Sequence, residues 1–224
     1  MKLLVVAAWE PELSRFRERL AERPAGVDLV LATLGVGVVE ASIAMTQCVS
    51  RETPAGALLL GTCGAFGAEP RAGSVVAGAG VRLVDASVVD GASALPAPMP
   101  AESTFDRAMH DALVAAGARS VQIANTVGIT TDDTLAERLA RGSGAGVEHL
   151  EAFAFARACA VARVPCATAL GIANVVGSKG RTEWLAGHVR ASQEAADLAW
   201  RALPAIVASL ESRASLAALR DAGA

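Results

Sequence analysis

Short apolar runs alternate with longer amphipathic segments along nearly the whole chain, and this alternation most strongly limits the possible folds. Such runs are typical of buried strands, and the longer segments are typical of helices that cover a sheet. The sequence therefore predicts an α/β fold with a mainly parallel or mixed sheet. We expect strands near 2–7, 28–34, 56–61, 74–84, 120–126 and 165–174, and helices near 11–22, 37–51, 103–116, 132–141, 149–162 and 188–211.

The length of 224 residues and the 53% hydrophobic content fit one large domain with a substantial core. We assign this domain to residues 1–211. Residues 212–224 are rich in alanine, and we expect them to form a fraying helical tail. The segment Asp90 to Pro100 contains three prolines among small residues, so it is expected to be a surface loop that could serve as a lid or a partner contact.

Charge and hydropathy exclude several classes of protein. The net charge is −3 and the basic residues are scattered singly, which leaves no basic stripe for nucleic acid. The apolar opening ends at Trp9-Glu10-Pro11, which is too early for a signal peptide or a membrane span. We see no other stretch of about 18 residues free of charges and helix breakers. We therefore expect a soluble, cytoplasmic protein without nucleic-acid or membrane partners.

The cysteines are expected to be reduced thiols in the core. Cys48, Cys63, Cys159 and Cys166 lie in apolar runs, without CxxC spacing or neighbouring histidines. This pattern predicts no metal site, and no motif in the chain indicates a cofactor.

Ligands of open α/β sheets bind beyond the carboxyl ends of the strands, so residues just after the apolar runs are the first candidates. Glu12 follows the first predicted strand, although it could be an ordinary acid in a first helical turn. Thr62, Cys63 and Gly64 follow the third strand in a glycine-rich turn that allows close backbone approach. That turn is neither GxGxxG nor a Walker loop, and it could be a plain turn.

Two later segments add further candidates. Glu148 and Glu151 lie three residues apart where an apolar helix is expected to begin, and a carboxylate there could bind the paired hydroxyls of a sugar or lie on the surface. Asn174 ends another apolar strand, and its amide can both donate to and accept from a heterocyclic base.

The histidines and one pair of acids are assigned structural roles. For His149 we expect a structural or surface role, because no serine or cysteine nucleophile accompanies it. His110 and His188 lie on predicted helix surfaces and are given no function. Asp132-Asp133 is read as a helix cap followed by a first-turn acid.

Taken together and in order, LLVVAAWEPEL, LLLGTCGAFG, GVEHLEAFAFA and the Asn174 segment resemble the nucleoside phosphorylase and nucleosidase superfamily. The resemblance implies a nucleoside phosphorylase-like fold, which is a single α/β domain with three α/β/α layers and a central mixed sheet. It further implies at least a homodimer, with subunit contacts near the active site. It also implies that Glu12 activates a water molecule and that Glu151 binds the ribose 2′ and 3′ hydroxyls. Further residues are expected to bind a purine nucleoside: Thr62, Cys63, Gly64, Ile129, Leu150 and Trp184.

The resemblance favours hydrolysis over phosphorolysis. Phosphorylases of this type carry an early Gly-Asp-Pro-x-Arg loop, which is absent here, and an arginine where this chain has Leu59. Without these cations a phosphate dianion would be bound poorly. Hydrolysis of an N-glycosidic bond is therefore the expected activity.

Asn174 bears on the substrate. Nucleosidases for methylthioadenosine and S-adenosylhomocysteine place an aspartate there to protonate the purine, whereas Asn174, Arg181 and Trp184 are similar to the pattern of futalosine hydrolases. Futalosine is the expected substrate, with Lys179 and Arg181 as candidates for its benzoate tail. The alternatives are a methylthioadenosine or S-adenosylhomocysteine nucleosidase and a catalytically weak nucleoside-binding domain.

Overall fold

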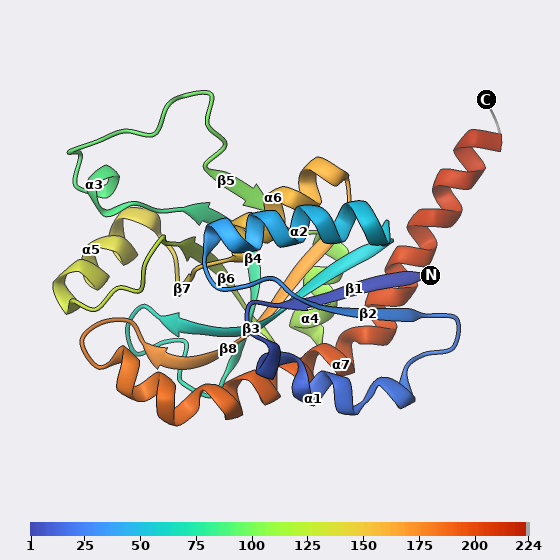
Figure 1. The fold of residues 1–224 in the computed structure, drawn as a ribbon, viewed down its shortest axis with the longest axis horizontal. Helices are drawn as coiled ribbons and strands as arrows, with labels where there is room; N and C mark the ends of the chain where they lie inside the picture. Colours follow the sequence, from blue (N-terminus) through green and yellow to red (C-terminus); the bar gives the residue numbers. More distant parts are fainter. Residues whose placement is uncertain (223–224) are drawn as a thin grey trace.

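The computed structural model describes residues 1–222, which form helical layers on both sides of a mixed sheet (Figure 1). The predicted α/β/α architecture is confirmed. The strands are β1 (Lys2–Ala7), β2 (Asp28–Thr33), β3 (Gly56–Ala65), β4 (Val75–Leu83), β5 (Glu102–Thr104), β6 (Arg119–Asn125), β7 (Val147–His149) and β8 (Cys166–Val175). The helical segments are η1 (Glu10–Leu13), α1 (Ser14–Glu18), η2 (Leu20–Glu22), α2 (Val38–Glu52), α3 (Ala86–Val89), α4 (Arg107–Ala115), α5 (Asp133–Ser143), α6 (Ala152–Ala162) and α7 (Gly180–Ala222).

The sheet closes on itself at its centre. Its order is β2-β1-β3-β7-β6-β4-β5, and β8 pairs with both β3 and β4, so β3, β7, β6, β4 and β8 form a ring. β8 is parallel to β3 and antiparallel to β4, while β3 and β7 are antiparallel. The ring therefore brings the end of β3 next to both β7 and β8.

Two hydrophobic clusters hold the layers together. On one face, side chains of α1, α4 and α7 pack against the sheet, with Phe16, Met109 and Leu203 among them. On the other face, α2 and α6 pack over the sheet through residues such as Met45 and Phe155. Figure 1 shows α2 and α6 above the strands and α1 and α7 below them.

Two helices are shorter than the sequence predicts, because residues assigned to them pair as strands. The helix expected over 103–116 divides into β5, which pairs with β4, and α4, whose cap Asp106 accepts a hydrogen bond from the amide of Met109 at 3.1 Å. The helix expected over 149–162 begins only at Ala152, because residues 147–149 pair with β3 and β6. The segment 11–22 also departs from one continuous helix, since it divides into η1, α1 and η2.

The last helix is longer than predicted. α7 begins at Gly180 rather than near residue 188, and residues 212–222 continue it as helix. Figure 1 shows its red end leaving the body of the protein. By length and composition α7 could cross a membrane, but core helices meet the same criterion. Ala199, Leu203 and Ile206 of α7 are buried in the core.

Other expectations agree with the structure. All four cysteines are buried and free of disulfide bonds. Residues 90–100 form no regular element and are mostly exposed. Asp132 caps α5 by accepting a hydrogen bond from the amide of Leu135 at 2.7 Å.

The contact between β8 and α7 leads to a first prediction. A Cβ at Gly171 would overlap the backbone carbonyl of Ala191, which cannot move without shifting α7. We expect Gly171→Ala to lower the free energy of unfolding by about 3 kcal/mol, and Tm by about 6 to 12 °C. Thermal unfolding measures this, with Gly128→Ala as control because a Cβ there meets no atom within 4 Å. Equal Tm values for the two variants would contradict the close packing.

Candidate active site

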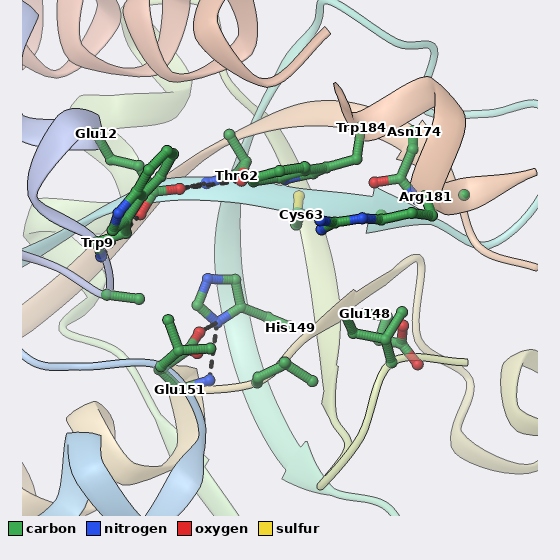
Figure 2. A pocket seen from close by; sticks show the side chains of 16 residues that line it. Trp9, Glu12, Thr62, Cys63, Glu148, His149, Glu151, Asn174, Arg181 and Trp184 are labelled. Atoms are coloured by element: carbon green, nitrogen blue, oxygen red, sulfur yellow. Dashed lines mark hydrogen bonds and ion pairs between the residues drawn. The ribbon is translucent and has the colours of Figure 1, made fainter. Parts of the chain in front are cut away.

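One pocket of about 360 Å³ lies where β3, β7 and β8 meet (Figure 2). This volume is within the range of small-molecule sites. The structure brings every candidate from the sequence to this pocket except Lys179, which is exposed and does not line it. Its lining includes Glu12, Thr62, Cys63, Gly64, Ile129, Leu150, Glu151, Asn174, Arg181 and Trp184, and also Ala8, Trp9, Val36, Glu148, His149 and Gly180.

Glu12 enters the pocket from η1 and is held by the glycine-rich end of β3. Its Oε1 accepts hydrogen bonds from the amide and the hydroxyl of Thr62, each at 3.0 Å. Trp184 Nε1 donates to the same hydroxyl at 3.2 Å, which leaves the hydroxyl proton of Thr62 directed at Glu12. Gly61 allows this approach, since a Cβ there would lie 3.2 Å from both carboxylate oxygens.

Burial shifts the pKa of Glu12 into the range of an effective base at neutral pH. Its side chain is enclosed, and the loss of solvation raises its pKa to about 7. Hydrogen bonds from Thr62 and Trp9 oppose the rise, and the nearby charge of Glu151 adds to it. A carboxylate with a pKa near 7 can accept a proton efficiently at neutral pH. Glu12 does lie in a first helical turn, as the alternative expected, but it is not an ordinary exposed acid there, because only 7% of the residue is exposed.

Glu151 lies opposite Glu12 at the start of α6 and is also buried. Its Oε1 accepts a hydrogen bond of 2.7 Å from the amide of Gly37, at the N-terminus of α2. The positive end of the α2 dipole stabilises a carboxylate at this place. Gly37 has a φ of +92°, which only glycine adopts readily. The surface alternative for Glu151 is therefore wrong as well.

A β-bulge directs Asn174 into the pocket. Cys63 pairs with Ile172 but Gly64 pairs with Asn174, so Ala173 is an extra residue in β8. Without the bulge, Asn174 would face the other side of the sheet. Its Nδ2 donates to the carbonyl of Val175 at 2.9 Å, and Figure 2 shows the side-chain oxygen turned toward the pocket. Gly64 and Gly180 leave room for this amide.

Aromatic rings line one edge of the pocket. The centroids of Trp9 and Trp184 are 6.1 Å apart. The guanidinium of Arg181 lies 5.3 Å from the Trp184 centroid, and His188 stacks on Trp184 at 4.2 Å. His188 is thus more than the plain surface residue that we expected. His110, by contrast, lies away from the pocket and contacts Asp111 and Ser120.

His149 lines the pocket, a position that the sequence did not predict. It was expected to be structural or on the surface, and the structure excludes the surface because 5% of it is exposed. Its Nδ1 accepts hydrogen bonds from the amides of Glu151 and Ala152, both at 3.1 Å, and so it caps α6. No local signal predicts this arrangement, since it depends on the pairing of β7.

Glu148 and Asn125 complete the buried polar groups around this turn. Glu148 accepts hydrogen bonds from the amide and hydroxyl of Thr130, and burial raises its pKa. Asn125 accepts from the amide of Phe153 at 2.9 Å and donates to the carbonyl of Leu150 at 3.0 Å. Asn125 therefore fixes the turn that carries Leu150 and Glu151.

The site has no activated thiol. Burial raises the pKa of the Cys63 thiol, and its Sγ donates to the carbonyl of Gly171 at 3.7 Å. Within residues 1–222, no group of three or more His, Cys, Asp or Glu side chains could hold a metal ion. The reactive groups that the described pocket offers are carboxylates, an amide, an imidazole and a guanidinium.

Residues 3–208 match the family model of the phosphorylase superfamily, which is nearly the whole chain. The chain belongs to this superfamily. It is 31% identical to futalosine hydrolase of Thermus thermophilus over 168 residues, which cover 71% of this chain and 75% of that protein. It is 33% identical to 5′-methylthioadenosine/S-adenosylhomocysteine nucleosidase of Tolumonas auensis over 102 residues, which cover 39% of this chain and 44% of that protein.

A solved structure shows the same fold. The 5′-methylthioadenosine/S-adenosylhomocysteine nucleosidase of Colwellia psychrerythraea, in complex with adenine, superposes with a TM-score of 0.82 at 19% identity. The match covers 92% of this chain and 95% of that one. The protein is an N-glycosidase of the nucleosidase type, which confirms the predicted class of enzyme.

The burial of Glu12 predicts how stability depends on pH. A carboxyl with a folded pKa of about 7 and a usual value of 4.5 remains protonated in the fold while the unfolded chain ionises. Stability contributed by this group is therefore lost as pH rises from about 4.5 to about 7. We expect Glu12→Gln to raise Tm by several degrees at pH 8 and to leave it nearly unchanged at pH 5.

Thermal unfolding at the two pH values measures the effect. Glu10→Gln is the matched control, because Glu10 lies on the same 3-10 turn but is exposed and paired with Arg17. A Glu12→Gln variant that is no more stable than the native protein at pH 8 would mean that Glu12 is not a buried, charge-destabilised group.

Proposed function

We propose that this nucleosidase hydrolyses futalosine to hypoxanthine and dehypoxanthine futalosine, a reaction of menaquinone biosynthesis. The observation that carries the proposal is the neutral amide of Asn174 in the lining of the pocket, where adenine-releasing relatives place an acid. The similarity to the Thermus thermophilus futalosine hydrolase supports the same substrate.

The leaving base explains why an amide suffices. Adenine is a poor leaving group unless N7 is protonated, and Asn174 has no acidic proton to give. The 6-oxo group of hypoxanthine delocalises the negative charge that develops when the N9–C1′ bond breaks. The side-chain amide of Asn174 lines the pocket and can form a hydrogen bond with such a base without giving up a proton.

Glu12 and Glu151 act on the ribose and the water. Glu12 removes a proton from a water molecule, whose oxygen forms the new bond to C1′ as the N9–C1′ bond breaks. The bonding electrons leave with the base, which then takes up a proton. Glu151 accepts hydrogen bonds from the ribose hydroxyls, and these strengthen as positive charge develops on the sugar.

The aromatic edge of the pocket suits an aryl carboxylate tail. Trp9 and Trp184 can stack on a benzene ring, and Arg181 can pair with a carboxylate. Lys179 lies on the loop before α7 and is the other cation considered for this tail. A methylthio group would leave these polar and aromatic groups without a partner.

The site also favours water over phosphate. Arg181 is the one arginine or lysine among the lining residues within the described chain, and Leu59 is buried in β3. Because three glutamates line this pocket, a phosphate dianion would meet repulsion without compensating cations.

A second candidate is a methylthioadenosine or S-adenosylhomocysteine nucleosidase. The match to the Tolumonas auensis protein supports it, and so does Glu148, a pocket carboxyl whose raised pKa could make it a substitute acid. We favour futalosine because both oxygens of Glu148 already accept hydrogen bonds from Thr130.

The active protein is proposed to be a homodimer or higher homo-oligomer. Val36 and Ile129 line the pocket yet are 62% exposed each, and Val39, Ile43 and Val127 on nearby segments are exposed too. Apolar side chains exposed together are common at subunit interfaces. A second subunit on this side would shield the substrate from bulk water.

The substrate proposal predicts a specific order of rates in phosphate-free buffer. We compare release of the base from futalosine, aminofutalosine, methylthioadenosine and inosine. Futalosine should have the highest kcat/KM, exceeding aminofutalosine by about 10-fold or more, because the two differ only at position 6 of the purine. Added phosphate should not increase the rate. A preference for methylthioadenosine would support the second candidate instead, and a rate that depends on phosphate would contradict hydrolysis.

Replacing Asn174 tests its role directly. Asn174→Asp supplies a titratable proton, so the futalosine-to-aminofutalosine ratio of kcat/KM should fall by about 10-fold or more at mildly acidic pH. Asn174→Ser, which offers neither the amide nor a carboxyl, is the control and should slow both substrates. An unchanged ratio in the aspartate variant would place the selectivity in the tail pocket.

A further inference from the structure

The His149 ring is fixed in one orientation and one tautomer. Two backbone amides, of Glu151 and Ala152, direct their hydrogens at Nδ1 from 3.1 Å each. Nδ1 must therefore carry a lone pair, which places the ring proton on Nε2. Burial lowers the pKa of the imidazole and keeps it neutral, although Glu151 opposes this shift.

The other edge of the ring is free for a ligand. The side chain is 4% exposed, and Figure 2 shows Nε2 turned away from Glu151 into the pocket, toward the side of Glu12 and Trp9. Among the hydrogen bonds within residues 1–222, none involves Nε2. A ligand that fills the pocket would separate this N–H from water, and an N–H left without an acceptor is then costly, so a bound ligand must offer Nε2 an acceptor.

Glu151 presents a complementary group near the Nδ1 edge of the same ring. Oε1 of Glu151 is held by Gly37, while Oε2 lies 3.3 Å from His149 Nδ1 and receives no hydrogen from a described residue. The pocket thus offers a carboxylate oxygen that only accepts near one edge of the imidazole and a ring N–H that only donates at the other edge. A hydroxyl group satisfies both, since it donates one hydrogen and accepts another.

The geometry points to His149 as a second ribose-binding residue, whose Nε2–H donates to the oxygen of a ribose 2′ or 3′ hydroxyl that itself donates to Glu151. This inference rests on the proposed nucleoside substrate but not on the identity of its base. The hydroxyl-binding pair is then built from one turn, residues 149–151, that also begins α6.

Two substitutions separate the pocket-facing role from the capping role. Asn places its oxygen near the position of Nδ1, so His149→Asn can keep the cap of α6 while it removes the Nε2–H. Gln places its nitrogen near the position of Nε2, so His149→Gln can keep the donor while it weakens the cap. Activity should therefore follow the donor, and Tm should follow the cap.

The substrates are futalosine, methylthioadenosine and the 2′-deoxy and 3′-deoxy forms of each. His149→Asn should lose about 5- to 10-fold in kcat/KM on the ribonucleosides, mainly through KM. For one of the two deoxy series the loss should vanish, because the hydroxyl that accepts from Nε2 is missing. His149→Gln should keep the native ratio between ribonucleoside and deoxynucleoside despite a lower Tm.

Each result bears on the proposal. A His149→Asn variant that discriminates between ribonucleoside and deoxynucleoside as strongly as the native enzyme would overturn it. If His149→Asn fails to fold, the His149→Gln variant decides. A His149→Gln variant that no longer discriminates between ribonucleoside and deoxynucleoside would overturn the proposal equally. Failure of native turnover with futalosine but not with methylthioadenosine would reject the proposed substrate and leave the His149 test intact, since both series are measured.

Discussion

Two carboxylates buried in one pocket are the constraint on which the rest of the site depends. Glu12 and Glu151 lose the solvation of water, and each is held by hydrogen bonds from a distant part of the chain. Thr62 at the end of β3 stabilises Glu12, and Gly37 before α2 stabilises Glu151. The closed ring of strands and the packing of α2 over the sheet bring these donors to the carboxylates.

His149 and Glu151 have different roles at the start of α6, and these roles follow from the same constraint. Glu151 occupies the position where a side chain commonly caps a helix, yet its carboxylate does not cap α6. His149 accepts the first amides instead, which frees Glu151 to face the ligand. At Glu12, burial destabilises the ionised fold but raises the pKa toward neutrality. Catalytic usefulness and stability therefore oppose each other at this residue.

The sequence predicted the layers and most strands because these follow from local hydropathy, and it predicted the pocket residues from family motifs. It could not predict β5 or β7, since three-residue strands are defined by their partners rather than by their own pattern. The bulge at Ala173 also has no local signal, although it decides which way Asn174 points. The pocket position of His149 was not predicted, because it depends on how β7 pairs with its neighbouring strands.

The aromatic edge of the pocket has a practical consequence for observing the protein in solution. The chain has three tryptophans and no tyrosine, so its intrinsic fluorescence arises almost entirely from indole. Trp9 and Trp184 line the pocket, whereas Trp200 is buried against Phe16 in the core. Pocket occupancy alters the surroundings of the first two rings, and only loss of the core alters those of the third. Emission therefore carries separate signals for ligand binding and for unfolding, without an added label.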